Sequence, residues 1–283
     1  MKTVQLFLYT ALVLIISGCR GSEPLDNIVR ASNPKAFNYV VPISQRGVSD
    51  IQENVGYYIV FDDEAMKANI TIANLLLPGE SQPMTMTFTD VDMGDSFNNH
   101  VGQRVVRSDV LISSDPVTSG FTITDVTFVY STTNSLDPND LNGIYARYTV
   151  NGQYVVTAYP YNIIADGTTR IDNLTEGGEF IDYTPCYRIV FDPERMLADV
   201  YTSGLTVGGE VCDFSIRGVR LNLTEDGYTL VSCEKTIVGS ETGVDVVDFS
   251  AEADLLDELR LRFTLKNDSG EFDVAAFLLP SLS

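Results

Sequence analysis

The chain has 283 residues and a formal net charge of −21, with one histidine, four cysteines and no tryptophan. Nucleic acids and anionic lipid surfaces are bound by clustered Lys and Arg, so this charge argues against both as partners. Because His100 is the only histidine, catalytic triads, Cys–His dyads and histidine-based metal sites are hard to assemble. We therefore expect no enzyme activity, no metal site and no cofactor.

Residues 1–18 have the layout of a secretion signal. Lys2 precedes an apolar run over about residues 6–16, which is too short to span a bilayer. The run ends in Ile16-Ser17-Gly18-Cys19, which resembles the lipobox of bacterial lipoproteins. The resemblance implies cleavage after residue 18 and attachment of lipid to Cys19, which would anchor the chain stably to a membrane.

Arg20 follows the lipobox cysteine, where lipoproteins retained in the inner membrane carry Asp. The resemblance therefore implies an outer-membrane location, facing either the periplasm or the cell surface. The residues after Arg20 are polar and include Pro24 and Pro34. We expect 19–36 to be a lipidated N-terminus and a spacer.

Two later segments, 57–68 and 187–198, follow one pattern. Eight of their twelve aligned positions are identical, and both contain Phe-Asp-x-Glu-x-Met-x-Ala. This element fits a structural corner, in which the Asp accepts hydrogen bonds from turn amides, better than a paired-carboxylate site.

The similarity continues along the chain in the same order. Residues 144–150 match 259–265, and after a turn 152–159 match 270–277. A constant order with varying separation is typical of a duplicated domain. The predicted division is a first β domain over 37–165 and a second β domain over 166–283.

Both copies have the alternation of antiparallel strands. Leu259, Leu261, Phe263 and Leu265 share one face, and polar residues occupy the other. Dipeptides such as Asn151-Gly152, Gly208-Gly209 and Asp226-Gly227 suit tight hairpins. No segment has a sustained helical period, and residues 165–185 are the expected connection between the copies, with a short first strand of the second copy as an alternative for part of it. In the second copy we predict strands at 186–192, 197–207, 211–223, 228–238, 244–253, 258–266 and 271–279.

The predicted fold is all-β, with two tandem homologous antiparallel domains that are calycin-like β-barrels or β-sandwiches. Either architecture buries the apolar faces and protects strand edges. With the lipobox and the repeated hairpins, the chain resembles bacterial outer-membrane lipoproteins with calycin-like, that is lipocalin-like, β domains. The resemblance implies a non-enzymatic cell-envelope protein that binds a small apolar ligand or a protein partner.

A weaker similarity, to two-domain fimbrillin-type pilus subunits, implies an alternative. The chain would then be a structural surface subunit or adhesin made of β-sandwiches. This alternative predicts an exposed, exchangeable terminal strand, with Phe272–Leu279 as the candidate.

Other candidate functional residues have plainer interpretations. Residues 137–143 carry several oxygen ligands, but their spacing fits a turn better than a calcium loop. His100 fits a solvated loop. Four tyrosines fit core packing and strand edges better than a glycan platform: Tyr57, Tyr58, Tyr159 and Tyr161.

Three cysteines remain after Cys19, an odd number in a compartment that permits disulfides: Cys186, Cys212 and Cys233. The predicted hairpins place Cys212 near Leu205 and Cys233 opposite Arg220. No two cysteines then face each other across a simple strand pair, and we expect no disulfide framework.

Overall fold

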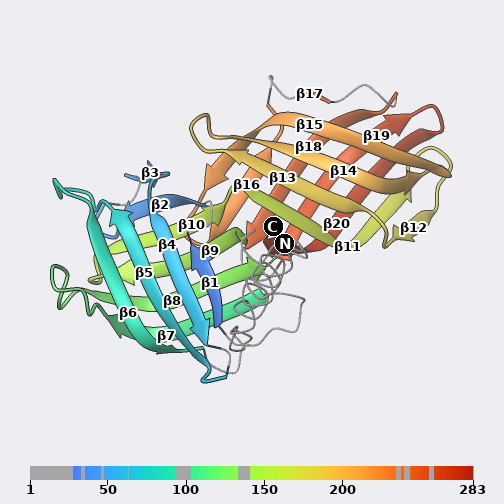
Figure 1. Ribbon diagram of the computed structural model, residues 1–283. Helices are drawn as coiled ribbons and strands as arrows, with labels where there is room; N and C mark the ends of the chain where they lie inside the picture. Colours follow the sequence, from blue (N-terminus) through green and yellow to red (C-terminus); the bar gives the residue numbers. More distant parts are fainter. Residues whose placement is uncertain are drawn as a thin grey trace, which may run out of the picture.

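The computed structural model describes residues 28–32, 36–45, 48–62, 64–93, 103–132, 141–233, 237–238, 243–254 and 258–282. Cys19 and the predicted signal lie outside these ranges, as do His100 and most of the 137–143 segment. The elements formed by the described residues are β-strands in antiparallel pairings, which confirms the all-β prediction (Figure 1). No helix within the described ranges has the length and hydropathy needed to cross a membrane.

The first half of the structure, β1 to β10, forms two antiparallel sheets (Figure 1). Its strands are β1 Ile28–Ser32, β2 Ala36–Pro42, β3 Asp50–Gln52, β4 Gly56–Asp62, β5 Lys67–Leu75, β6 Met84–Asp92, β7 Gln103–Ile112, β8 Thr122–Thr132, β9 Leu141–Val150 and β10 Tyr154–Pro160. One sheet has the order β1-β4-β5-β6, and the other has the order β3-β2-β10-β9-β8-β7. The inward faces of both sheets pack into one apolar cluster.

The second half, β11 to β20, forms one sheet whose strand order returns to its start. Its strands are β11 Asn162–Asn173, β12 Glu179–Asp182, β13 Cys186–Asp192, β14 Leu197–Val207, β15 Glu210–Leu223, β16 Gly227–Val231, β17 Ile237–Val238, β18 Asp245–Asp254, β19 Glu258–Asn267 and β20 Gly270–Leu282. The order runs from β11 through β13, β14, β15, β16, β18 and β19 to β20, and β20 also pairs with β11. These pairings close the sheet into a ring.

Side chains fill the interior of this ring. Leu259, Leu261, Phe263 and Leu265 are buried on the predicted face of β19. They share one cluster with inward residues of the other ring strands, and large aromatic side chains such as Tyr187 and Tyr228 are also fully buried there. Close packing of this kind stabilises the half by removing apolar area from water.

The sequence prediction and the structure differ at several places. The strand predicted at 228–238 is not one strand: β16 ends at Val231 and pairs with β18, whereas β17 pairs with β15. The expected spacer, 19–36, contains β1, which pairs with β4. The expected connection, 165–185, contains the end of β11 and all of β12, so it does contribute strands to the second half, and the predicted domain boundary falls inside β11. The cause is polar composition: β11 alternates buried Ile163, Ala165 and Ile171 with exposed polar residues, so its strand signal is weak.

The terminal strand also differs from what the fimbrillin-type alternative predicts. Residues 272–279 belong to β20, which is hydrogen-bonded along one edge to β19 and along the other to β11. Removal of β20 would open the ring. The strand is therefore an integral member of the sheet and not an exposed, exchangeable end.

The repeated Phe-Asp-x-Glu-x-Met-x-Ala element forms the same turn in both halves. The Asp62 carboxylate accepts a hydrogen bond from the Ala65 amide at 2.9 Å, and Asp192 accepts one from the Arg195 amide at 3.1 Å. Met66 and Met196 have φ angles of 52° and 53°. The element is a corner between two strands, as its composition predicts.

The strands around this corner also pair alike. Register shifts in the β5–β6 pair fall after Ala68 and after Ile72, and those in the β14–β15 pair fall after Ala198 and after Thr202. Such bulges bend a strand at a defined position. The two halves therefore bend their corresponding strands at corresponding residues.

Candidate functional site

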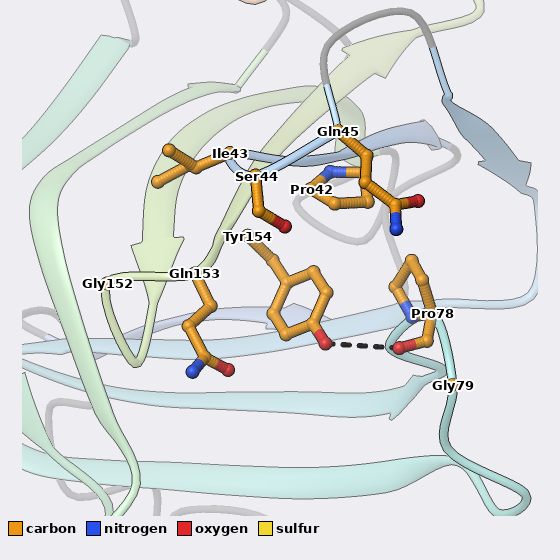
Figure 2. A pocket seen from close by; sticks show the side chains of 9 residues that line it. All are labelled: Pro42, Ile43, Ser44, Gln45, Pro78, Gly79, Gly152, Gln153 and Tyr154. Atoms are coloured by element: carbon orange, nitrogen blue, oxygen red, sulfur yellow. Dashed lines mark hydrogen bonds between the residues drawn. The ribbon is translucent and has the colours of Figure 1, made fainter.

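A hollow of about 590 Å³ lies at one end of the first half (Figure 2). It is bounded by three turns: the chain after β2, the chain after β5 and the β9–β10 turn. Tyr154 forms its centre, and the phenol donates a hydrogen bond to the Pro78 carbonyl at 3.1 Å. The lining residues are Pro42, Ile43, Ser44, Gln45, Pro78, Gly79, Gly152, Gln153 and Tyr154.

A second hollow, of about 370 Å³, lies at one end of the second half. It is bounded by the turn after β11, the β14–β15 turn and the start of β20. Its lining residues are Ile171, Asn173, Gly177, Gly178, Glu179, Phe180, Thr206, Gly208, Gly209 and Phe272.

The two hollows occupy matching positions in the strand pattern. Tyr154 lies opposite Pro42 in the β10–β2 pair, and Phe272 lies opposite Asn173 in the β20–β11 pair. Each aromatic residue is near the start of the last strand of its half. We call the two sites the Tyr154 hollow and the Phe272 hollow.

Their chemistry differs. The Tyr154 hollow contains Ser44, Gln45 and Gln153 beside the phenol, and Figure 2 shows the phenol directed toward Pro78. The Phe272 hollow has no hydroxyl at the corresponding ring, and the exposed ring of Phe180 stands on its rim. The first hollow suits a polar group, and the second suits an apolar one.

Glycines of two turns line the Phe272 hollow. Gly177, Gly178 and Gly209 have positive φ angles, and a Cβ atom built on any of them would meet no other atom within 4 Å. Side chains at these three positions would project into open space, so the turn geometry alone accounts for glycine there. At Gly208 a Cβ atom would also lie 2.7 Å from Ser269 Cβ and 3.3 Å from the Phe272 ring.

A third hollow, of about 970 Å³, lies along the outer side of β14 and β15. Arg195 and Arg220 are on its rim, with Leu197 and Cys233. Cys233 Sγ donates to the Gly218 carbonyl at 3.1 Å. Corresponding positions in the first half carry the ion pair between Lys67 and Asp92, so this surface differs between the halves.

Of the described cysteines, Cys233 lines the third hollow, and Cys186 and Cys212 line none of the three hollows. Cys212 lies opposite Leu205, as predicted. The predicted position of Cys233 is wrong, because Arg220 lies opposite Val231, where β16 ends. No disulfide joins Cys186, Cys212 and Cys233, the cysteines that the structure describes. Burial raises the pKa of the Cys186 and Cys212 thiols, which lowers their reactivity. Within the described ranges, no group of three or more His, Cys, Asp or Glu side chains could hold a metal ion.

The four tyrosines considered in the sequence do not form one site. Tyr57 and Tyr159 are fully buried, whereas Tyr58 is 44% exposed. The Tyr161 hydroxyl donates to the Glu53 carboxylate. The hollows themselves could not be predicted from the sequence, because turns distant in the chain form them. The predicted Asn151-Gly152 and Gly208-Gly209 turns, which contribute lining residues to the two hollows, were the only sequence features that pointed to these positions.

No protein-family model and no curated protein matches the chain. Among solved structures, it is similar to a Bacteroides fragilis protein provisionally described as an outer membrane protein, with a TM-score of 0.32 and 9% identity. The match covers 90% of this chain and 98% of that chain.

Proposed function

We propose that this chain is a non-enzymatic lipoprotein of the outer membrane that binds a small apolar ligand at the Phe272 hollow. Cys19 would hold it to the membrane, and two copies of one calycin-like β unit would form the body. The lipobox supports the anchor, and the shared corners, bulges and pairings support the duplication. Arg20 in place of Asp supports the outer membrane.

The position of the hollow carries the binding proposal. Side chains fill the interior of the closed sheet formed by β11 to β20. A ligand therefore finds space at one end of that sheet and not inside it. There the ring of Phe272 lies behind turns of glycine, with Phe180 exposed on the rim. Phe180 is 52% exposed, and a ligand that covered it would gain apolar contact area.

Native mass spectrometry of residues 20–283 tests this proposal. A co-purified mass that is lost on denaturation identifies the ligand class. In parallel, the neutral apolar dye N-phenylnaphthylamine is titrated into the protein, and its fluorescence is followed. We expect saturable binding that Phe180→Ser weakens by about tenfold.

Phe277→Ser is the matched control, because Phe277 is 41% exposed but does not line the hollow. It should leave dye binding unchanged. Equal weakening by both substitutions would show that the dye binds exposed rings nonspecifically. If no mass co-purifies and dye binding does not saturate, the hollow has no small-ligand role.

A further inference from the structure

The third hollow, along the outer side of β14 and β15, differs in charge from the chain as a whole. The chain has 39 Asp and Glu against 18 Lys and Arg. The hollow nevertheless has Arg195 and Arg220 on its rim, and none of the described residues that line it is Asp or Glu. Guanidinium groups attract anions and can bind both oxygens of a carboxylate. We call this site the Arg220 hollow.

Both guanidinium groups are accessible to a ligand. Arg220 is exposed and forms no hydrogen bond or ion pair with the described residues. Arg195 forms an ion pair with Asp192, but the distance of 3.7 Å between Nε and Oδ2 is too long for a hydrogen bond, and the Arg195 side chain is 76% exposed. Such a pair contributes little in water, so the Arg195 guanidinium can turn to another anion.

Apolar residues line the hollow beside these charges. Met196 and Leu197 are half-buried, and Met196 packs against the apolar cluster of the second half. Leu197 lies opposite Arg220 in the β14–β15 pair, so an apolar side chain and a guanidinium are direct neighbours. A ligand that combines an anionic group with an apolar body matches this pairing.

The first half has a different arrangement at the corresponding positions. Lys67 lies opposite Asp92 in the β5–β6 pair, and the two side chains form an ion pair. Both charges are therefore used within the chain. The second half has leucine at the position of the lysine and arginine at the position of the aspartate. This difference leaves a guanidinium without an internal partner, which suits it to an anion from outside.

Contacts with the first half hold the strands that carry this hollow. The β15–β16 turn packs on β9 and β10, where the Glu225 carbonyl accepts a hydrogen bond from Arg147 Nε at 3.2 Å. The Tyr159 hydroxyl lies 2.6 Å from the Thr224 carbonyl and 2.9 Å from the Gly227 carbonyl, and it donates its proton to them. A site on strands that are already fixed loses less entropy when a ligand binds.

We propose that the Arg220 hollow binds a small carboxylate with an apolar body. The carboxylate contacts Arg220 and Arg195, and the apolar body covers Met196 and Leu197. The net charge of −21 repels anions at long range, but salt at physiological ionic strength screens charges beyond about 8 Å, so the nearest groups dominate. The inference does not rest on the ligand proposed for the Phe272 hollow, which is a separate site.

Isothermal titration calorimetry of residues 20–283 with octanoate tests this proposal. Octanol has the same alkyl chain without the carboxylate, and acetate has the carboxylate without the long chain. We expect octanoate to bind at least about tenfold more tightly than either compound. The affinity for octanoate should fall as salt is raised, because the guanidinium groups are exposed.

A substitution at Arg220 locates the bound carboxylate. Arg220→Asp gives this position the residue type that the first half has, and it should weaken octanoate binding by about tenfold or more. Arg262→Asp is the charge-matched control, because Arg262 is also exposed and does not line the hollow. It should leave octanoate binding unchanged. Circular dichroism checks that both variants fold.

Phe180→Ser separates this site from the Phe272 hollow and should also leave octanoate binding unchanged. Binding that is lost in Phe180→Ser but kept in Arg220→Asp would overturn the proposal, as would the absence of octanoate binding or equal binding of octanol. Equal weakening by Arg220→Asp and Arg262→Asp would overturn it too, because the overall charge and not the hollow would then govern the affinity.

Discussion

The two halves of the molecule share their corners and bulges but differ at their edges and outer faces. In the second half, β11 is one continuous strand that pairs with β13, β12 and β20 and closes the ring. In the first half, two strands have these roles: β1 pairs with β4, and β2 pairs with β3 and β10. The inward pattern fixes the common fold, and connections and outward residues are free to change.

The outer faces of β10 and β20 differ in how far they are covered. Tyr159 is buried beneath the second half, whereas Phe277 at the corresponding position is 41% exposed. The alternation along β10 and β20 is the same. The difference lies in what covers each face, which no strand pattern encodes. Substitutions at matched positions can therefore separate the stability of the shared fold from the contributions of the contact between halves.

The largest difference is expected for alanine at the matched aromatic positions. Tyr159→Ala removes a stacked ring and a hydroxyl bonded to two carbonyls, and it should cost about 3–5 kcal/mol of unfolding free energy. Phe277→Ala should cost under about 1 kcal/mol, because the ring is partly in water. Urea unfolding of both variants measures the difference. Similar losses of unfolding free energy for the two variants would contradict the conclusion that the face around Tyr159 is covered and the face around Phe277 is open.

Much of the fold can be predicted from the sequence, for physical reasons. Alternation with a period of two and Gly-containing turns placed β13 and β14 at their observed residues. The contact between halves could not be predicted, because Glu225 takes part through its carbonyl, which any residue has. The hollows likewise depend on turns that meet only after the sheets have formed.

A smaller difference is expected at the buried tyrosines of the two corners. The Tyr57 hydroxyl is 2.5 Å from Asn38 Oδ1 and 3.2 Å from the Tyr148 hydroxyl. The matching Tyr187 hydroxyl bonds only with Thr169 Oγ1, at 3.1 Å, among the described residues. Tyr57→Phe leaves an amide and a phenol in the core with one partner fewer, and should cost about 1–3 kcal/mol.

Tyr187→Phe should cost less, about 0.5–1.5 kcal/mol, because a single hydroxyl loses its partner. Chemical denaturation at neutral pH compares the two variants. Asn38→Ala combined with Tyr57→Phe serves as the control, since it removes the orphaned amide. If the double variant is no more stable than the sum of the two single losses predicts, the buried network is not coupled.

The edge strands β3 and β12 provide a difference that depends on pH. Gln52 bonds through its amide to the Leu76 backbone, with Nε2 donating at 2.6 Å and Oε1 accepting at 3.0 Å. The matching Asp182 accepts from the Thr206 amide at 2.9 Å and from Thr184. Burial raises the pKa of Asp182, but the hydrogen bonds from Thr184 and Thr206 together outweigh it and lower the pKa below its ordinary value.

Because the folded-state pKa of Asp182 is lowered, its contribution is present above the unfolded pKa, about 3.9, and is lost as pH falls through the folded value. Asp182→Asn should therefore cost about 1–2 kcal/mol at neutral pH and less near pH 3. Gln52→Ala should lower the unfolding free energy by the same amount at neutral pH and near pH 3. Unfolding free energies of the two variants, measured across this pH range, test both expectations. A loss for Asp182→Asn that does not vary with pH would rule out the carboxylate's role.

The smallest effect is expected at the bulge residues. Asn74 and Gly204 occupy corresponding bulges, with φ angles of 63° and 75°. A Cβ atom at Gly204 would meet the Thr184 carbonyl at 3.5 Å, an ordinary contact, so only the backbone conformation opposes substitution. Asparagine tolerates that conformation, and Gly204→Asn should change stability by less than about 0.5 kcal/mol.

Gly204→Val has the same space but a β-branched side chain, which the left-handed region disfavours, and should cost about 1–2 kcal/mol. Thermal unfolding of the Gly204→Asn and Gly204→Val variants separates the cost of the backbone conformation from the cost of packing. Equal losses for asparagine and valine would mean that the bulge in the second half needs glycine for a reason absent from the first. The similarity of the two bulges would then be limited to their register, and their backbones would differ as the outer faces do.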